Sequence, residues 1–345
     1  MSEISNVNIQ ELYELDNLGK RVVQKGNVGS TYIYALQILG DGGGKAANVY
    51  RAKPNNGSVN YSGSACLVLN GYNTLSKNKK QAAGGHTQTW EYAGSNAKNN
   101  ADSGWFIGTK PKKNDSYYWD TQIARVKFEN KSWDYNTQLP RISNLNQAGR
   151  KYGLGYSGTK LVRSEAAVSE YISGDSENSY KYFLIVTVDD SGTGYFSLYN
   201  LNDINQALNT NGTSDVNLKT NSVAEKCLKA FKIDNLTSKV GSLQGFDIDS
   251  NENIYISSES HPNKTGSIIS KPRKIVKIPW NTTETSQWDF IRLDNYTILD
   301  ESGYATEFEG IQVNSENDLY LTVAYHNKDG YKTDLNKIFR ISWKS

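Results

Sequence analysis

The side chains best suited to binding a ligand recur at matched places in a repeat. Two stretches of this 345-residue chain, "LQGFDIDSNENIYISSESH" (243–261) and "FEGIQVNSENDLYLTVAYH" (308–326), each carry a Gln or Glu, then Gly, then two apolar segments flanking a polar turn. The same pattern predicts five anchors, all acidic or amide residues: Gln24, Gln88, Glu165, Gln244 and Glu309. Because calcium takes carboxylate, amide and carbonyl oxygens, Glu165 and Glu309 are the candidate metal ligands.

The three histidines are His86, His261 and His326, and none belongs to a local ligand pair such as HExxH. His261 and His326 lie 17 residues after Gln244 and Glu309, so the repeat places them at the ends of equivalent strands. Structural hydrogen bonding and a ligand site on one face of the fold are both open interpretations.

Aromatic side chains are abundant, with 23 Tyr and 7 Trp in the chain. Tyr and Trp pack in cores and also stack on sugar rings, while nearby polar side chains bond the hydroxyls. The residues that could bind a glycan are Trp90, Trp119, Trp133 and Tyr135. Packing between strands is the alternative for all four.

No catalytic constellation is evident, and we expect a protein that is not an enzyme. "GLGYSG" (153–158) has the GxGxxG spacing but lacks the strand before it and the helix after it that bind a dinucleotide. "DIDSNENIY" (247–255) resembles a calcium loop, yet strand patterns surround it, so a β-hairpin is predicted. A catalytic triad assembled from distant residues stays open.

The elements that would position these residues are strands. Each anchor precedes two or three alternating segments, the fourth segment in successive units being 64–70, 138–143, 229–234 and 288–293. The fifth unit ends at Trp343 without a fourth strand, and the segment 7–15 can supply it. This predicts an all-β, five-bladed β-propeller of four-stranded blades, closed by an N-terminal strand and forming one domain over 1–345. The anchors would then ring a central channel; a β-sandwich is the rival fold.

Charge and hydropathy limit the partners. The net charge of +2 gives no general attraction to nucleic acid. No segment approaches the ~20 apolar residues of a transmembrane helix, and no secretory signal is visible at the start. We expect a monomer that is extracellular or associated with a cell surface, exported without such a signal or shown here without its leader.

Several strings resemble one known family, the helveticin J family of large, heat-labile bacteriocins of lactobacilli. They are "VVQKGNVGS" (22–30), "GGHTQTWEYAG" (84–94), "WFIG" (105–108), "QIARV" (122–126), "EAAVS" (165–169), "NIYISS" (253–258), "IVKIP" (275–279) and "YLTVAYH" (320–326). The resemblance spans nearly the whole chain in order. It implies a secreted or surface-associated protein that inhibits related bacteria, and it carries over no catalytic residue.

The sequence therefore predicts a helveticin-like bacteriocin that binds a cell-envelope component, most simply a wall glycan, and needs no cofactor. Two alternatives remain. One is a surface adhesin or lectin without toxicity, and the other is a propeller hydrolase that depends on calcium held by Glu165 and Glu309. Fold alone does not choose among them, because propellers serve many functions.

Overall fold

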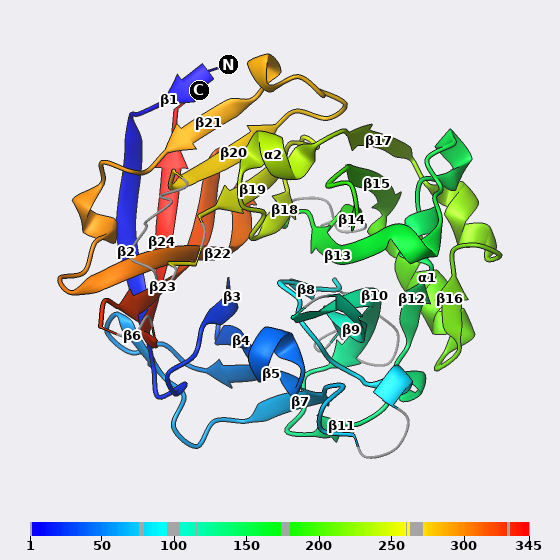
Figure 1. Ribbon diagram of the computed structural model, residues 1–345, viewed down its shortest axis with the longest axis horizontal. Coiled ribbons are helices and arrows are strands. Elements are labelled where there is room, and N and C mark those ends of the chain that lie inside the picture. Colours follow the sequence, from blue (N-terminus) through cyan, green and yellow to red (C-terminus); the bar gives the residue numbers. More distant parts are fainter. Residues whose placement is uncertain are drawn as a thin grey trace. The chain divides into compact units, whose positions relative to one another are not determined.

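The computed structural model describes residues 2–75, 79–94, 104–114, 116–173, 180–259, 261–262, 272–329 and 332–344. In these residues the strands form five small sheets, and the fold class is a five-bladed β-propeller, as the repeat predicts (Figure 1). The chain divides into two compact units. Unit 1 is Met1–Gln37, Val49–Ala65 and Thr237–Ser345, and unit 2 is Ile38–Asn48 and Cys66–Leu236. The single domain expected over 1–345 stays a prediction.

We number the blades by the chain order of their first strands. Blade 1 contains β3 (Val23–Val28), β4 (Ile33–Leu39), β5 (Ala46–Ala52), β7 (Cys66–Asn70) and β11 (Ser132–Trp133). Blade 2 contains β8 (Trp90–Tyr92), β9 (Gly104–Asn114), β10 (Tyr117–Lys127), β12 (Arg141–Ser143) and β16 (Asp215–Asn217). Blade 3 contains β13 (Leu161–Val168), β14 (Tyr182–Asp189), β15 (Gly194–Asn200) and β17 (Lys229–Ile233). Blades 2 and 3 belong to unit 2.

Blades 4 and 5 belong to unit 1. Blade 4 contains β18 (Phe246–Ile248), β19 (Ile254–Ser258), β20 (Lys274–Ile278), β21 (Asp289–Arg292) and β1 (Ser2–Ile4). Blade 5 contains β22 (Tyr304–Ser315), β23 (Asp318–Asn327), β24 (Thr333–Trp343), β2 (Val7–Asp16) and β6 (Ser58–Asn60). The strand β2 pairs antiparallel with β24, from Val7 opposite Trp343 to Glu14 opposite Lys337. The N-terminal strand therefore completes the last blade, as predicted.

Four-stranded blades were predicted, but four of the five blades carry a fifth strand in the described residues. The additional strands β1, β6, β11 and β16 have two or three residues each and run parallel to the fourth strand of their sheet. An exposed fourth strand would leave a row of unpaired backbone groups, so these segments shield the outer edges. They are too short to show an alternating sequence pattern.

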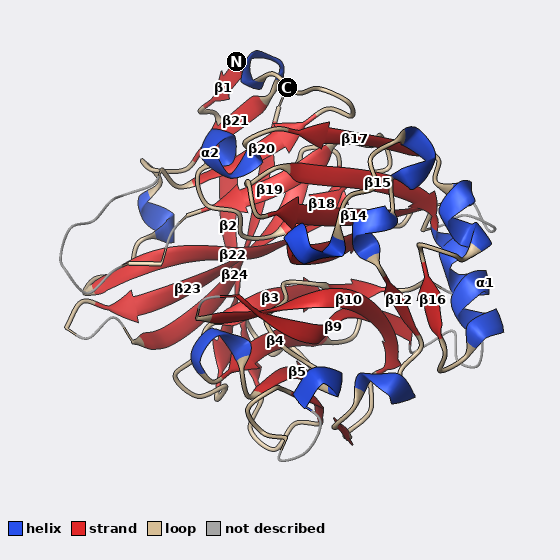
Figure 2. Ribbon diagram, turned by 45° about the vertical axis from the view of Figure 1, so that its right-hand side comes forward, coloured by secondary structure: helices blue, strands red, loops and turns tan. Residues whose placement is uncertain are grey.

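The helices are few. The longest helix of the described residues, α1 (Leu201–Asn211), lies near β16 at the outer side of blade 2 (Figure 2). A short helix, α2 (Leu236–Val240), precedes blade 4. The 3₁₀ turns are η1 (Asp41–Gly43), η2 (Lys79–Gln81), η3 (Asn136–Gln138), η4 (Leu145–Gln147), η5 (Arg150–Tyr152), η6 (Gly158–Lys160), η7 (Ser222–Lys226), η8 (Thr285–Gln287) and η9 (Thr297–Leu299).

Within each unit the sheets pack through apolar side chains. In unit 2, Phe106 of β9 lies 4.6 Å from Phe183 of β14, centroid to centroid, inside a buried cluster of blades 2 and 3. In unit 1, Tyr255 of blade 4 and Phe308 of blade 5 belong to one buried cluster. Alternating side chains of each strand supply these contacts, because every second residue faces the same side of the sheet.

The glycine after an anchor is required by close strand packing in unit 1. A Cβ atom on Gly245 would lie 2.6 Å from Cα of Gly310, and one on Gly310 would lie 2.6 Å from the carbonyl oxygen of Gln24. Both distances are shorter than the contacts that Cβ atoms make in folded proteins, so a side chain at either position would clash with the neighbouring backbone. The Gly that follows Gln244 and Glu309 therefore allows the first strands of neighbouring blades to approach.

Two sequence motifs have the structural role predicted for them. β18 and β19 pair antiparallel, with Ile248 opposite Ile254, so 247–255 is a β-hairpin. In its turn, Asp249 accepts hydrogen bonds from the backbone and side chain of Asn253. Residues 153–158 run from the end of η5 to the first residue of η6, outside any strand-to-helix connection.

Candidate functional site

In unit 2 the anchor Glu165 is fully buried and surrounded by donors. Its Oε2 accepts from Thr87 Oγ1 (3.2 Å), the Gln88 backbone N–H (3.1 Å) and Thr89 Oγ1 (2.6 Å). Its Oε1 accepts from Nε of Arg163 at 3.0 Å. The other anchor of this unit, Gln88, accepts from Nη2 of Arg163 at 2.5 Å. These hydrogen bonds hold the Glu165 carboxylate in place and link blades 2 and 3.

A second buried carboxyl lies beside this network. Asp120 of β10 is 0% exposed, and burial together with the charge of Glu165 raises its pKa well above the usual range. Carbon atoms added at Gly85 and Gly108 would each lie 2.7 Å from its carboxylate oxygens, so the two glycines leave the space it occupies. Burial and the neighbouring Glu165 therefore both favour the neutral form of Asp120.

In unit 1 the anchors make local contacts. Gln24 Nε2 donates to Glu309 Oε1 at 3.4 Å, joining β3 to β22. Gln244 Nε2 donates to the carbonyl oxygen of Glu259 at 2.8 Å, within blade 4. Gln24 and Glu309 are buried, and Gln244 is half-buried. A ring of all five anchors, and calcium held by Glu165 and Glu309, stay predictions.

An aromatic stack surrounds His86 in unit 2. Its ring stacks on Trp119 with centroids 3.9 Å apart and lies 5.6 Å from the ring of Tyr117. The guanidinium carbon of Arg163 lies 4.3 Å from the Trp119 centroid. Burial and the positive charge of Arg163 lower the pKa of His86 to about 3. Trp119 is half-buried and already has two stacking partners, whereas Tyr117 is 48% exposed and keeps accessible ring surface.

A second aromatic surface lies at the outer edge of blade 1, also in unit 2. Trp133 is half-buried in β11, and Nζ of Lys131 lies 3.9 Å from its ring centroid. Asn70 Nδ2 donates to Ser132 Oγ (2.8 Å) and to Asp134 Oδ1 (2.6 Å). We call Asn70, Lys131, Ser132, Trp133 and Asp134 the Trp133 patch. It combines an aromatic ring with amide, hydroxyl, carboxylate and ammonium groups, the mixture that recognises sugars.

The other two aromatic candidates differ in exposure. Tyr135 is half-buried and follows the Trp133 patch along the chain, where it bridges to Ala82. Trp90 is 0% exposed and stacks on Trp105, with centroids 4.8 Å apart and planes 2° apart. A glycan has no access to the Trp90 ring in this conformation, so its contribution is packing in blade 2.

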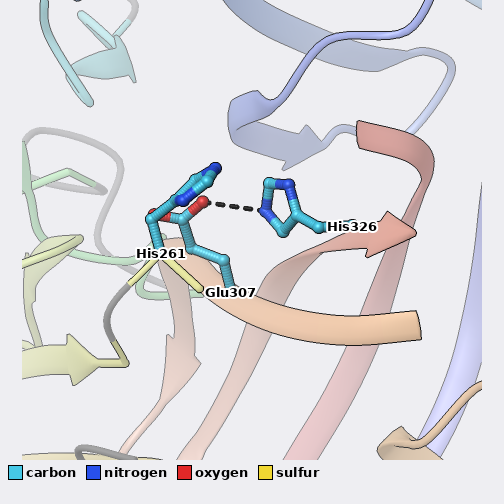
Figure 3. A group of neighbouring side chains, drawn as sticks. All are labelled: His261, Glu307 and His326. Atoms are coloured by element: carbon cyan, nitrogen blue, oxygen red, sulfur yellow. Dashed lines mark hydrogen bonds and ion pairs between the residues drawn. The ribbon is translucent and has the colours of Figure 1, made fainter. Parts of the chain in front are cut away.

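The two remaining histidines meet in unit 1. The rings of His261 and His326 have centroids 4.3 Å apart in a T-shaped arrangement. Nε2 of His326 lies 3.0 Å from Oε2 of Glu307 (Figure 3). One ligand atom from each of His261, Glu307 and His326 lies within 4.8 Å of the others. This is a set of donors able to hold a metal ion.

Several residues of these sites were not among the sequence candidates, including Asp120, Arg163, Glu307 and Tyr117. Glu307 precedes the anchor Glu309 by two positions in "EFEG", and the alternation of a strand was the signal that both lie on one side of β22. Tyr117 precedes Trp119 by two positions in "YYW", so strand alternation places both on one side of β10. The order of residues along the chain does not show which side chains of other strands Glu307 and Tyr117 contact.

The described residues include no helix long and apolar enough to cross a membrane. The five β-blades define a β-propeller that carries local clusters of aromatic, carboxyl and histidine side chains. The family model "Bacteriocin helveticin-J" matches residues 3–344. A relative, bacteriocin helveticin-J of Lactobacillus helveticus, is 39% identical over 362 residues, covering 99% of this chain and 99% of the relative. The chain belongs to the helveticin J family, as the sequence strings predicted.

Among solved structures, a protein of unknown function from Dyadobacter fermentans covers 99% of this chain and 97% of its own chain, with 7% identity and a TM-score of 0.36. A second, of unknown function from Nostoc punctiforme, covers 90% of this chain and 88% of its own, with 9% identity and a TM-score of 0.11.

Proposed function

We propose that this protein acts outside the producing cell as a bacteriocin that binds a wall glycan of related bacteria and inhibits their growth. The observation that carries the proposal is the 39% identity to a bacteriocin across 99% of both chains. The Trp133 patch supplies a binding surface, because an aromatic ring can stack on a sugar face while Asn70 and Asp134 bond its hydroxyls. Binding requires no covalent chemistry and no catalytic residue.

The test combines binding and killing on the same cells. Purified protein is mixed with lactobacillus cells and with isolated wall fractions, and bound protein and surviving cells are counted. The proposal expects saturable wall binding with loss of viability. Binding without killing would indicate a non-toxic adhesin, and absence of binding to every wall fraction would contradict the proposal.

Trp133→Ala locates the binding surface. Loss of a central aromatic contact typically costs about 2 kcal/mol, or roughly 30-fold in affinity for walls. Tyr152→Ala is the matched control, since Tyr152 is an exposed aromatic of the same unit, 44% exposed, on η5. Equal losses in both variants would show that the Trp133 patch is not the glycan site.

Calcium at Glu165 and Glu309 is a separate proposal, which would favour a hydrolase. Glu165→Gln plus Glu309→Gln removes both charges while retaining side-chain shape. A calcium-dependent hydrolase would lose activity in this variant and in EGTA, while glycan binding by folded protein would continue. The many donors around Glu165 favour a structural carboxylate, so we expect wall binding to withstand EGTA.

A further inference from the structure

Three metal-ligating side chains converge in unit 1 from two blades. His261 follows the end of β19 in blade 4, and Glu307 and His326 lie on the paired strands β22 and β23 of blade 5. Figure 3 shows the three side chains pointing toward one another, with the contact between Glu307 and His326 drawn as a dashed line. The ligand atoms of all three lie within 4.8 Å of one another, which places them around one common point.

Strand pairing positions two of these ligands. Glu307 lies opposite Ala324, and Ala305 lies opposite His326, so Glu307 and His326 are diagonal neighbours on the two strands. The other ring nitrogen of His326, Nδ1, lies 3.3 Å from Thr333 Oγ1 of β24. Such a contact to the second nitrogen orients an imidazole that binds a metal through its first nitrogen.

Burial and charge suit a cation. His326 is 0% exposed and Glu307 is 6% exposed, whereas His261 is exposed and leaves the site open on its side. In the part of the chain that the structure describes, Glu307 has no lysine or arginine within ion-pair distance. A carboxylate buried without a lysine or arginine is costly, and a divalent cation held together with His326 would compensate it.

Glu259 is a neighbouring carboxylate that does not belong to this group of three ligands. Glu259 precedes His261 by two residues, and its Oε1 accepts from Thr306 Oγ1 at 2.7 Å. Its Oε2 is buried and has no hydrogen-bond partner among the described residues. A simple His326–Glu307 hydrogen bond does not explain the approach of His261 from the other blade.

We propose that His261, Glu307 and His326 bind one divalent transition-metal ion, most favourably zinc, with at least one coordination position left for water or an exogenous ligand. Two imidazoles and one carboxylate are a zinc ligand set, and three protein ligands leave a tetrahedral ion incomplete. This goes beyond the bacteriocin proposal and is independent of it. It also differs from the calcium site, since imidazole nitrogen favours transition metals over calcium.

Metal titration tests the proposal directly. Tag-free protein is stripped with dipicolinate, dialysed, and titrated with Zn²⁺ by calorimetry and with Co²⁺ by visible absorption. We expect one ion per chain and Co²⁺ bands typical of a four- or five-coordinate site. No saturable binding up to about 1 mM Zn²⁺, an affinity too weak for a specific site, would overturn the proposal.

Variants show where the ion binds. His261→Ala carries the test, because His261 is exposed and its loss spares the buried packing. Removing one ligand should weaken Zn²⁺ binding at least ~100-fold, since even outer partners of a ligand contribute 10–100-fold. Glu307→Gln should act likewise. The control Glu284→Gln removes an exposed carboxylate of the same unit and should bind as the parent does. Parental binding by folded His261→Ala would overturn the proposal.

Discussion

The two histidine regions of this molecule contain the same side chain in opposite surroundings. His86 in unit 2 stacks on Trp119 near the guanidinium of Arg163, and its pKa is lowered to about 3. His326 in unit 1 instead contacts the carboxylate of Glu307 and the ring of His261. The first environment repels a second positive charge, while the second supplies a carboxylate and another imidazole.

The difference shows that neighbours decide what a histidine can do. Beside Arg163 the imidazole acts as a neutral, flat packing group, because protonation would bury a second cation. Beside Glu307 the same ring can donate a lone pair to a metal ion that the carboxylate attracts. Changing a histidine or one of its neighbours therefore tests this contrast.

The largest effect is expected from Arg163→Met. This change leaves the buried carboxylate of Glu165 without its cation, and loss of one partner of a buried pair costs about 3–5 kcal/mol. The urea midpoint for unfolding measures the loss. As a control, Arg292→Met breaks an exposed pair with Glu3 and should cost at most about 1 kcal/mol. Similar losses in the two variants would contradict the buried role of Arg163.

Zinc should stabilise the folded protein through the histidines of unit 1 and not through His86 of unit 2. At a free concentration about 100 times the dissociation constant, a ligand specific for the folded state adds about 2.7 kcal/mol to the free energy of unfolding. We expect this gain for the parent and for His86→Phe, but not for His261→Ala. Thermal unfolding with and without Zn²⁺ measures it. A gain that persists in His261→Ala would move the ion away from the proposed ligands.

The third prediction concerns acid. The folded-state pKa of His86 is depressed to about 3 while an unfolded histidine titrates near 6.5, so the unfolded chain binds a proton first as pH falls. Stability is therefore lost below about pH 6.5, by about 2 kcal/mol between pH 6.5 and 5. His86→Phe should flatten this part of the profile. Chemical unfolding at each pH tests it, and an unchanged slope in the variant would refute the assignment to His86.

The smallest effect is expected from Tyr117→Leu. Tyr117 is the exposed end of the stack, and an aromatic pair contributes about 0.5–1.5 kcal/mol beyond burial, so we expect a loss of less than about 1 kcal/mol. His86 should keep its low pKa, because Trp119 and Arg163 still cover it; NMR titration of the imidazole measures this. A pKa near 6.5 in the variant would assign the shift to Tyr117 instead.

Much of the fold was predictable because the relevant information is local. The sequence pattern identified fourth strands such as β17 (Lys229–Ile233) and β21 (Asp289–Arg292) within one residue of their ends. The missing fourth strand after Trp343 was correctly assigned to 7–15, since β2 pairs with β24. The sequence did not predict the fifth strands, which are β1, β6, β11 and β16. A segment of two or three residues is too short to show an alternation of apolar and polar side chains.

The sequence by itself determined the repeat, the blade count, the family and the matched positions of His261 and His326, because these depend on spacing along the chain. Only the tertiary structure decided that Glu307 joins the two histidines, that Trp90 is buried, and that Arg163 lies between Glu165 and Trp119. Strand alternation states which side of a sheet a residue faces, but not which residue of the next sheet it meets. That choice is made by strand twist and blade packing, which bring together side chains far apart in sequence.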